Sequence, residues 1–434
     1  MKTTRTFLTL VFIATTAALI GMGVDAAADE LDPLLRLLVA KDIITQEEAL
    51  SLQVESEAIE TAEAPAPPEA ETPPQAAEKR YPAWIDRFDA KGDIRLRYEG
   101  FSQDGSYDDD RRDRFRFRLR AGFEATVTDW MKVGLEMRNG DPSDPVSNNT
   151  SFDGGFQFKE FNLAEGYLQI RPSERFGLIV GKFDAKKWWT VSDFQWDDDV
   201  TVEGLMTNFG LASGDGAFKS LDLVAYAFLL EEQKSGSDAN LYGGQLRSTF
   251  RLGGDNALKV GAGFDAWNNP QHIADLTASG DLKGNEITNF IDADGQLLSD
   301  FEILNFFAEY KNSSSKKWPV KFTLFYYQNL GAEGLGAAND TGYFGRVQVG
   351  DYKKQGQLAL RYSYYYSEPD ALFYVFTQSD TGRGSNAEAH RFDLRLGFVA
   401  KSHFNFTWYN TKPVYKEYED ETINRWQFDY IVKF

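Results

Sequence analysis

RDRFRFRLRAGFEATV, residues 112–127, is the stretch that decides the fold. Arginines stand at every second position from Arg114 to Arg120, and apolar residues fill the positions between them and continue to Val127. Only a β-strand puts alternate side chains on two opposite faces over such a length. A strand that crosses a bilayer needs about 9–11 residues, apolar toward lipid and polar toward a lumen. A strand of a water-soluble sandwich usually has about 5–6. The rest of the chain decides between the two.

The N-terminus has the pattern of a secretory signal peptide. Lys2 and Arg5 precede an apolar run over residues 7–20, and three alanines at 26–28 offer a small-residue cleavage site. We therefore expect residues 1–28 to be a signal peptide and the mature chain to begin near Asp29. A retained membrane anchor is the alternative, but the apolar run is short for a span.

Composition excludes several classes of protein. No other segment approaches 18 consecutive apolar residues, which excludes a helical inner-membrane protein. The absence of cysteine excludes disulfide scaffolds and thiol catalysis. A net charge of −20 argues against a nucleic-acid partner, which needs a basic surface. An aromatic content of 15% fits the aromatic girdles of a membrane barrel.

Residues 29–60 change to a helical pattern. Asp32 and Pro33 can open one short amphipathic helix, and Thr45 with Glu48 forms a capping box for a second. Neither helix can bury its apolar stripe alone, so we expect a coiled-coil-like module that associates with itself, with neighbouring subunits or with a partner such as peptidoglycan. A loose helical hairpin without a partner is the alternative. Residues 61–80, rich in Pro, Ala and Glu, are an extended linker.

Sixteen candidate strands follow, and residues 81–434 are therefore predicted to form one antiparallel transmembrane β-barrel. The ranges are 91–101, 112–127, 131–140, 157–171, 174–184, 200–211, 219–230, 240–252, 256–267, 301–311, 317–329, 341–351, 355–367, 388–400, 403–412 and 422–434. Short turns alternate with long loops between them. Outer-membrane barrels have short periplasmic turns and long external loops, so both chain ends and the helical module are expected in the periplasm.

The last strand ends on an aromatic residue. Trp426, Phe428, Tyr430, Val432 and Phe434 alternate with polar residues and Ile431. This terminal strand resembles the signature of bacterial outer-membrane proteins. The whole chain, with the helical segment LDPLLRLLVAKDIITQEEALSLQ before a linker and barrel, resembles the putative-porin family of Gram-negative outer membranes. The resemblance implies a sixteen-stranded, trimeric diffusion pore in contact with outer-membrane lipid and lipopolysaccharide.

One wall of the expected lumen is basic. With the apolar parity toward lipid, neighbouring strands and the closing strands turn a set of cations inward. The predicted pore-lining residues are Arg95, Arg97, Arg114, Arg116, Arg118, Arg120, Lys132, Arg138, Arg391, Arg395 and Arg425. Asp93, Glu99, Glu124 and Glu136 share this face and can neutralise part of the charge. Fully paired, structural arginines are the alternative interpretation.

The third long loop, AKKWWTVSDFQWDDD at residues 185–199, resembles in position the porin loop that narrows the pore. Its tryptophans and Phe194 can pack inside the barrel, while its charged residues face the basic wall and create a transverse field. The predicted constriction residues are Lys186, Lys187, Asp193, Asp197, Asp198 and Asp199. A solvated acidic loop is the alternative.

No catalytic or cofactor site is predicted. The three histidines, His272, His390 and His403, lie in different connections or strand ends, and no serine motif accompanies them. We therefore expect no enzyme activity, metal or cofactor, and predict an outer-membrane porin that passes small hydrophilic solutes and ions. Two alternatives are a channel specific for anions such as phosphate and a barrel that anchors an adhesin or an envelope tether.

Overall fold

The computed structural model describes residues 45, 47–48, 51–52, 87–103, 112–416 and 421–434. The predicted signal peptide, the linker and most of the helical module lie outside the described residues. Within residues 45–52, the predicted capping box is confirmed. The backbone N–H of Thr45 donates to the Glu48 carboxylate at 2.8 Å, and the Glu48 N–H donates to the Thr45 hydroxyl at 3.3 Å. This reciprocal pair satisfies two backbone donors at a helix start.

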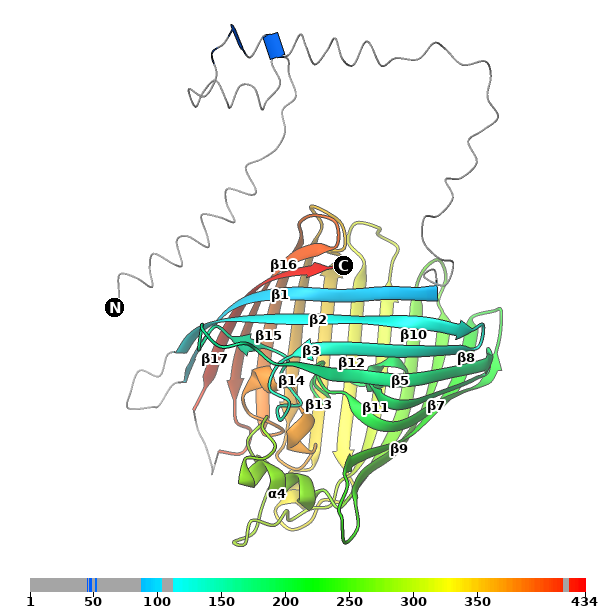
Figure 1. Cartoon of the computed structure of the whole chain (residues 1–434). Helices are drawn as coiled ribbons and strands as arrows, with labels where there is room; N and C mark the ends of the chain where they lie inside the picture. The colour runs from blue at the N-terminus through cyan, green and yellow to red at the C-terminus, as the bar shows by residue number, and fades with distance from the viewer. Residues whose placement is uncertain (1–44, 46, 49–50, 53–86, 104–111, 417–420) are drawn as a thin grey trace. The chain divides into compact units, whose positions relative to one another are not determined.

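The described part of residues 81–434 is a closed antiparallel β-barrel of sixteen long strands (Figure 1). In chain order the first eight are β1 (Phe88–Gln103), β2 (Arg112–Thr128), β3 (Met131–Asn139), β5 (Phe161–Ser173), β6 (Phe176–Phe183), β7 (Val202–Ser213), β8 (Phe218–Glu231) and β9 (Ala239–Arg251). The others are β10 (Ala257–Asn268), β11 (Glu302–Asn312), β12 (Val320–Asn329), β13 (Thr341–Gly350), β14 (Leu358–Ser367), β15 (Ala387–Gly397), β16 (Ser402–Lys412) and β17 (Ile423–Lys433). All sixteen predicted strands are confirmed, with ends that move by a few residues.

The connections contain short elements that the strand pattern did not predict. A two-residue strand, β4 (Thr150–Ser151), pairs with β2. The helix α4 (Gln271–Ser279) lies between β10 and β11, at the opposite end of the barrel from the C-terminus (Figure 1). Single 3-10 turns are η2 (Ala185–Lys187), η3 (Gly336–Ala338), η4 (Tyr374–Phe376) and η5 (Ser379–Thr381). Among the described residues, no helix has the length and apolar character needed to span a membrane.

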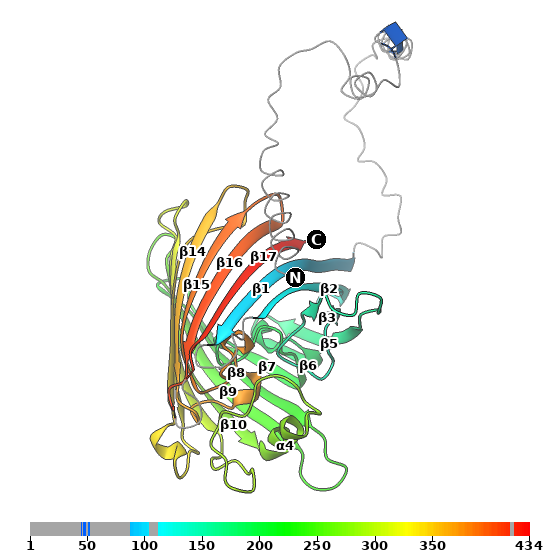
Figure 2. The same ribbon diagram turned by 90° about the vertical axis from the view of Figure 1, so that its left-hand side faces the viewer.

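Pairing of the first and last strands closes the barrel. β1 and β17 are paired antiparallel from Asp93 opposite Lys433 to Gln103 opposite Ile423. Phe434 extends the seam, because its N–H donates to the Gly92 carbonyl at 3.0 Å and its carbonyl accepts from the Gly92 N–H at 3.2 Å. A Cβ at residue 92 would lie 2.4 Å from the Phe434 ring, so only glycine fits there. The two views show β1 and β17 side by side (Figures 1 and 2).

The outer surface of the barrel is apolar. Large side chains on successive strands are strongly exposed, such as Ile94 at 42%, Leu324 at 59% and Phe428 at 44%. Contiguous exposed apolar surface of this extent is unfavourable in water and favourable against lipid hydrocarbon. The alternation first seen in residues 112–127 therefore places the arginine parity toward the lumen.

The lumen is divided into an apolar half and a charged half. On β6–β14 the inward side chains are largely apolar and buried, including Phe183, Phe228, Leu241, Tyr327 and Phe344. They form a core against two loops that fold into the barrel, loop 3 (residues 184–201) and loop 7 (residues 368–386). The remaining open space lies against β1, β2 and β14–β17, where the inward side chains are charged.

Candidate functional site

The register of β1 and β2 stacks arginines directly across from one another. Arg97 pairs with Arg116, and Arg95 pairs with Arg118, so four guanidinium groups share one patch of the inner wall. Like charges opposite one another in a sheet are destabilising unless other groups neutralise them. The arrangement therefore requires carboxylates close by.

Buried carboxylates on β1 and β17 neutralise most of this patch. Asp429 accepts two bonds from Arg97 at 2.6 and 3.0 Å, and Asp93 pairs with Arg118 at 2.8 Å and Arg120 at 2.5 Å. Glu99, whose side chain is fully buried, pairs with Arg114 at 2.5 Å. Bidentate pairs of this kind fix the guanidinium planes as well as their charge.

A second cluster lies on β14 and β15. The buried carboxylate of Asp393 is 2.9 Å from Arg361, 2.9 Å from Arg391 and 3.6 Å from Arg395, and it also accepts from the Thr407 hydroxyl at 3.1 Å. One carboxylate thus holds three arginines of the closing strands in place. The basic wall continues from β14 through the seam to β2.

Loop 3 folds into the barrel through its aromatic residues. Trp189 lies 5.0 Å from Tyr226, and Phe194 lies 5.0 Å from Tyr365, measured between ring centroids. Asp184 caps the first turn by accepting from the Lys186 N–H at 2.9 Å. With its apolar side packed on β8 and β14, the loop presents Lys186, Asp198 and Asp199 to the open space.

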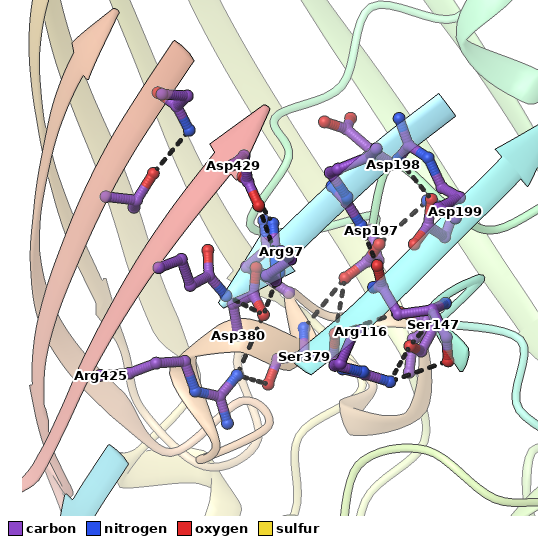
Figure 3. Close-up of a pocket in the computed structure, with 18 of the residues that line it drawn as sticks. Arg97, Arg116, Ser147, Asp197, Asp198, Asp199, Ser379, Asp380, Arg425 and Asp429 are labelled. Atoms are coloured by element: carbon purple, nitrogen blue, oxygen red, sulfur yellow. Dashed lines mark hydrogen bonds and ion pairs between the residues drawn. The ribbon is translucent and has the colours of Figure 1, made fainter. Parts of the chain in front are cut away.

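Loop 7 is a second inserted loop, which the strand pattern does not predict. Its residues 371–376, ALFYVF, are all buried, and Phe376 stacks on Trp196 of loop 3 at 5.0 Å. This apolar run in a connection was the signal that could have revealed it. The insertion carries Asp380 to the wall, where its carboxylate lies 3.0 Å from Arg425 and 3.7 Å from Arg97 (Figure 3).

Loops 2, 3 and 7 meet at one point. Loop 2 comprises residues 140–160, and the carbonyl of its Val146 accepts from the Ser379 hydroxyl at 3.1 Å. The Asp197 carboxylate of loop 3 accepts from the N–H of Ser379 at 3.0 Å. Figure 3 shows Asp380 beside Arg97 and Arg425, with Ser379 next to it. Hydrogen bonds between the three loops therefore fix the acidic side of the space opposite the wall.

A cavity of about 1000 Å³ lies between the wall and these loops. Its described lining includes twelve arginines and two lysines but only seven aspartates and one glutamate. It extends from Arg112 and Arg425, near the long loops, to Arg395 and Lys433, near the short turns. The cavity therefore follows the charged wall along the barrel, with cations in excess.

Most residues singled out from the sequence line this cavity, and four do not. Arg138 is turned into a buried cluster with Glu136 at 2.5 Å and Glu165 at 3.6 Å, and Lys187 joins Glu165 at 2.9 Å. Lys132 lies near Glu124. Asp193 pairs with Arg346 at 2.5 Å and lines a separate cavity of about 260 Å³. Lining residues that the sequence analysis did not select include Asp144, Ser147, Asn149, Tyr352, Arg361 and Asp380.

The acidic side chains of the loops differ in pKa. Burial would raise the pKa of Asp199, but Arg118 and Arg95 overcome this effect and lower it to about 2. Asp197 is equally enclosed and has Asp199 beside it, so its pKa is raised well above the ordinary value. Burial also raises the pKa of Asp144, to about 6. The acidic side therefore carries less negative charge at neutral pH than its composition suggests.

A closed sixteen-stranded barrel with a lipid-facing apolar band and a charged lumen defines an outer-membrane β-barrel channel. Residues 102–279 match a family model described as "Putative porin". This match and the closed barrel together support assignment to the outer-membrane porins and a general function as an outer-membrane channel.

Solved structures agree on the fold. Pseudomonas putida OprB, in a high-pH structure, aligns with a TM-score of 0.52 and 10% identity over 81% of this chain and 95% of that one. Salmonella typhi OmpF in complex with daunomycin aligns with a TM-score of 0.48 and 11% identity over 81% and 99%. No curated protein sequence matches the chain. The OprB alignment supports the barrel architecture, and an identity this low carries no ligand across.

Proposed function

We propose that the chain is a passive diffusion channel for small hydrophilic solutes and ions, and that the cavity along the arginine wall is its pore. The observation that supports this proposal is the continuous charged lining from the long-loop end to the short-turn end. A polar lumen lets hydrated solutes pass without shedding their hydration water against an apolar surface. Loops 3 and 7 then set the size limit, and the field between them and the wall orients polar solutes.

The excess of cations in the lining predicts a preference for anions. The side chains of Asp93, Glu99, Asp393 and Asp193 are buried beside arginines and leave few acidic groups in contact with the cavity. We expect purified protein in a planar bilayer to give discrete conductance steps. In a potassium chloride gradient, the sign of the reversal potential should show that chloride passes more readily than potassium. A reversal potential of the opposite sign, which shows preference for potassium, would mean that the aspartates of the loops determine the selectivity instead.

Acidification is expected to strengthen this anion preference. Because the pKa of Asp144 is raised to about 6, its carboxylate is charged above that pH and becomes neutral below it. Asp144 lines the cavity near Arg116, Asp141 and Asp199, so its protonation removes one negative charge from the pore. Reversal potentials between pH 5 and 7.5 measure the effect. Asp197 and His403 also line the cavity, so Asp144→Asn is the control: the part of the change that this variant loses belongs to Asp144.

We also propose that the helical module and linker stand on the periplasmic side, after removal of a signal peptide of residues 1–28, and that the protein works as a homotrimer. The capping box at Thr45 and Glu48 supports a true helix in the module. The Vibrio cholerae outer-membrane protein OmpT, one of the similar structures, is described in a trimer form. A short helix with an apolar stripe needs a partner surface, and peptidoglycan or a neighbouring subunit would provide one.

A further inference from the structure

Among the described residues, two arginines of the wall have no carboxylate within 3.5 Å. Arg95 donates from Nη2 to the side-chain oxygen of Asn149 at 2.5 Å, and no carboxylate among the described residues lies within 4 Å of it. Arg116 donates to the Ser147 hydroxyl at 3.2 Å and to the Asn149 carbonyl at 2.9 Å. Its nearest carboxylate, Glu99, is 3.8 Å away and is already engaged with Arg114.

The other acidic groups nearby are committed elsewhere. Asp429 is held by Arg97, and Asp93 is held by Arg118 and Arg120. On the loop side, Asp199 lies 3.7 Å from Arg118 and accepts from the Asn148 N–H at 3.1 Å, while Asp144 accepts from the Val146 N–H at 3.2 Å. In the part of the chain that the structure describes, Arg95 and Arg116 therefore have no carboxylate closer than 3.8 Å, and Asp199, Asp380 and Asp429 act on them only from a longer distance.

Both side chains also keep an unused donor. The Nε atoms of Arg95 and Arg116 are buried and have no hydrogen-bond partner in the described structure. Because Arg95 pairs with Arg118 and Arg97 with Arg116 across β1 and β2, the two side chains are diagonal neighbours on the same inner face. Both line the 1000 Å³ cavity together with Ser147 and Asn149. Guanidinium groups do not lose their proton in proteins, so these donors are always present.

We propose that Arg95 and Arg116, oriented by Ser147 and Asn149, form a binding site in the pore for a small multivalent oxyanion of the phosphate type. Such an ion has several oxygens that can take two N–H bonds from each planar guanidinium, whereas chloride is a single point acceptor. This inference rests on the proposed diffusion function and adds a substrate class to the same cavity. The site attracts oxyanions from the bulk and releases them into the basic path beyond it.

The experiment is a phosphate block of single-channel chloride current. In wild-type protein, inorganic phosphate added to potassium chloride should reduce the current in a saturable way, because a bound oxyanion occupies the path longer than chloride does. The double variant Arg95→Gln/Arg116→Gln should need about 10-fold more phosphate for the same block. The double variant Arg95→Lys/Arg116→Lys should behave like the glutamine variant, because lysine keeps the charge without the planar donor geometry.

Arg112→Gln is the matched control, since it removes one pore cation outside the site and should leave the phosphate block in place. Folding of each variant is checked first by its heat-modifiable band. Chloride steps that phosphate does not reduce in the wild type would overturn the site and leave the channel function standing. Equal block in the lysine variant and the wild type would also overturn it, by assigning the effect to charge alone. Absence of any conductance step in the folded wild type would contradict the channel function itself.

Discussion

Replacing Asp393 with alanine is expected to lower the free energy of unfolding by about 3–5 kcal/mol, the usual cost of breaking a buried ion pair by removing one partner. The Asp393 side chain is fully buried and lies within 4 Å of Arg361, Arg391 and Arg395. Without it, three guanidinium groups on β14 and β15 lose their shared counter-charge and repel one another, and Arg391 keeps only Asp193 of loop 3, at 3.4 Å. The barrel wall should therefore loosen where the cavity approaches the short turns.

Urea titration of the protein in detergent measures this loss of stability. The folded fraction at each urea concentration is read from the heat-modifiable band in electrophoresis. Glu203→Ala is the matched control, because Glu203 also has a cationic partner, Lys182 at 2.8 Å, but its side chain is 62% exposed. An exposed pair contributes about 0–1 kcal/mol. Coincident unfolding curves for the two variants would show that the Asp393 cluster does not stabilise the wall.

The variant Asp380→Asn is expected to raise the chloride-to-potassium permeability ratio by about three- to tenfold. Asp380 is the acidic group that loop 7 inserts into the wall, close to Arg425 and Arg97 and accepting from the Gln427 amide at 2.8 Å. Asparagine keeps the shape and can still accept these bonds, so the loop should stay in place while the charge disappears. The Coulomb energy between two unit charges about 4 Å apart is about 4 kcal/mol at an effective dielectric constant of about 20. Water and salt in the pore reduce the effect of the lost charge on a passing ion.

Reversal potentials in a salt gradient provide the measurement. Asp198→Asn removes a charge from the same cavity, but the Asp198 side chain is 70% exposed and contacts only Lys186 among the described cations. Its permeability ratio should change less. If Asp198→Asn shifted the ratio more than Asp380→Asn, loop 3 would dominate selectivity and loop 7 would serve mainly as packing.

The strands could be predicted because alternation with a period of two is a local property of the sequence. β2 and β17 carry it most clearly, with arginines or other polar residues inside and aromatic residues outside. The apolar half of the lumen could not be predicted in this way. β8 is apolar on both faces from Leu223 to Leu230, and the inserted loops explain why the inward side chain of Phe228 is buried away from water.

The arginine wall and its partners Asp93 and Glu99 could be predicted from the sequence, but the carboxylates that the loops bring to it could not. Neighbouring strands place Arg95, Arg97, Arg116 and Arg118 together by register alone. The contacts of loop 7 depend on how a 19-residue connection folds in three dimensions, which no periodicity encodes. For the same reason the sequence does not show which aspartates of loop 3 face the cavity. In the structure Asp193 turns to Arg346, while Asp198 and Asp199 face the cavity.

The seam between β1 and β17 determines when the pore acquires its charge pattern during folding. The bidentate partner of Arg97, Asp429, lies 332 residues further along the chain. Contacts of such high sequence separation form late, because the chain between them must be ordered before they meet. Until then Arg97 faces Arg116 with one carboxylate missing. Closing the cylinder thus also completes the charge balance around Arg97, and a folding intermediate with an open seam has neither a sealed wall nor the finished charge pattern of the channel.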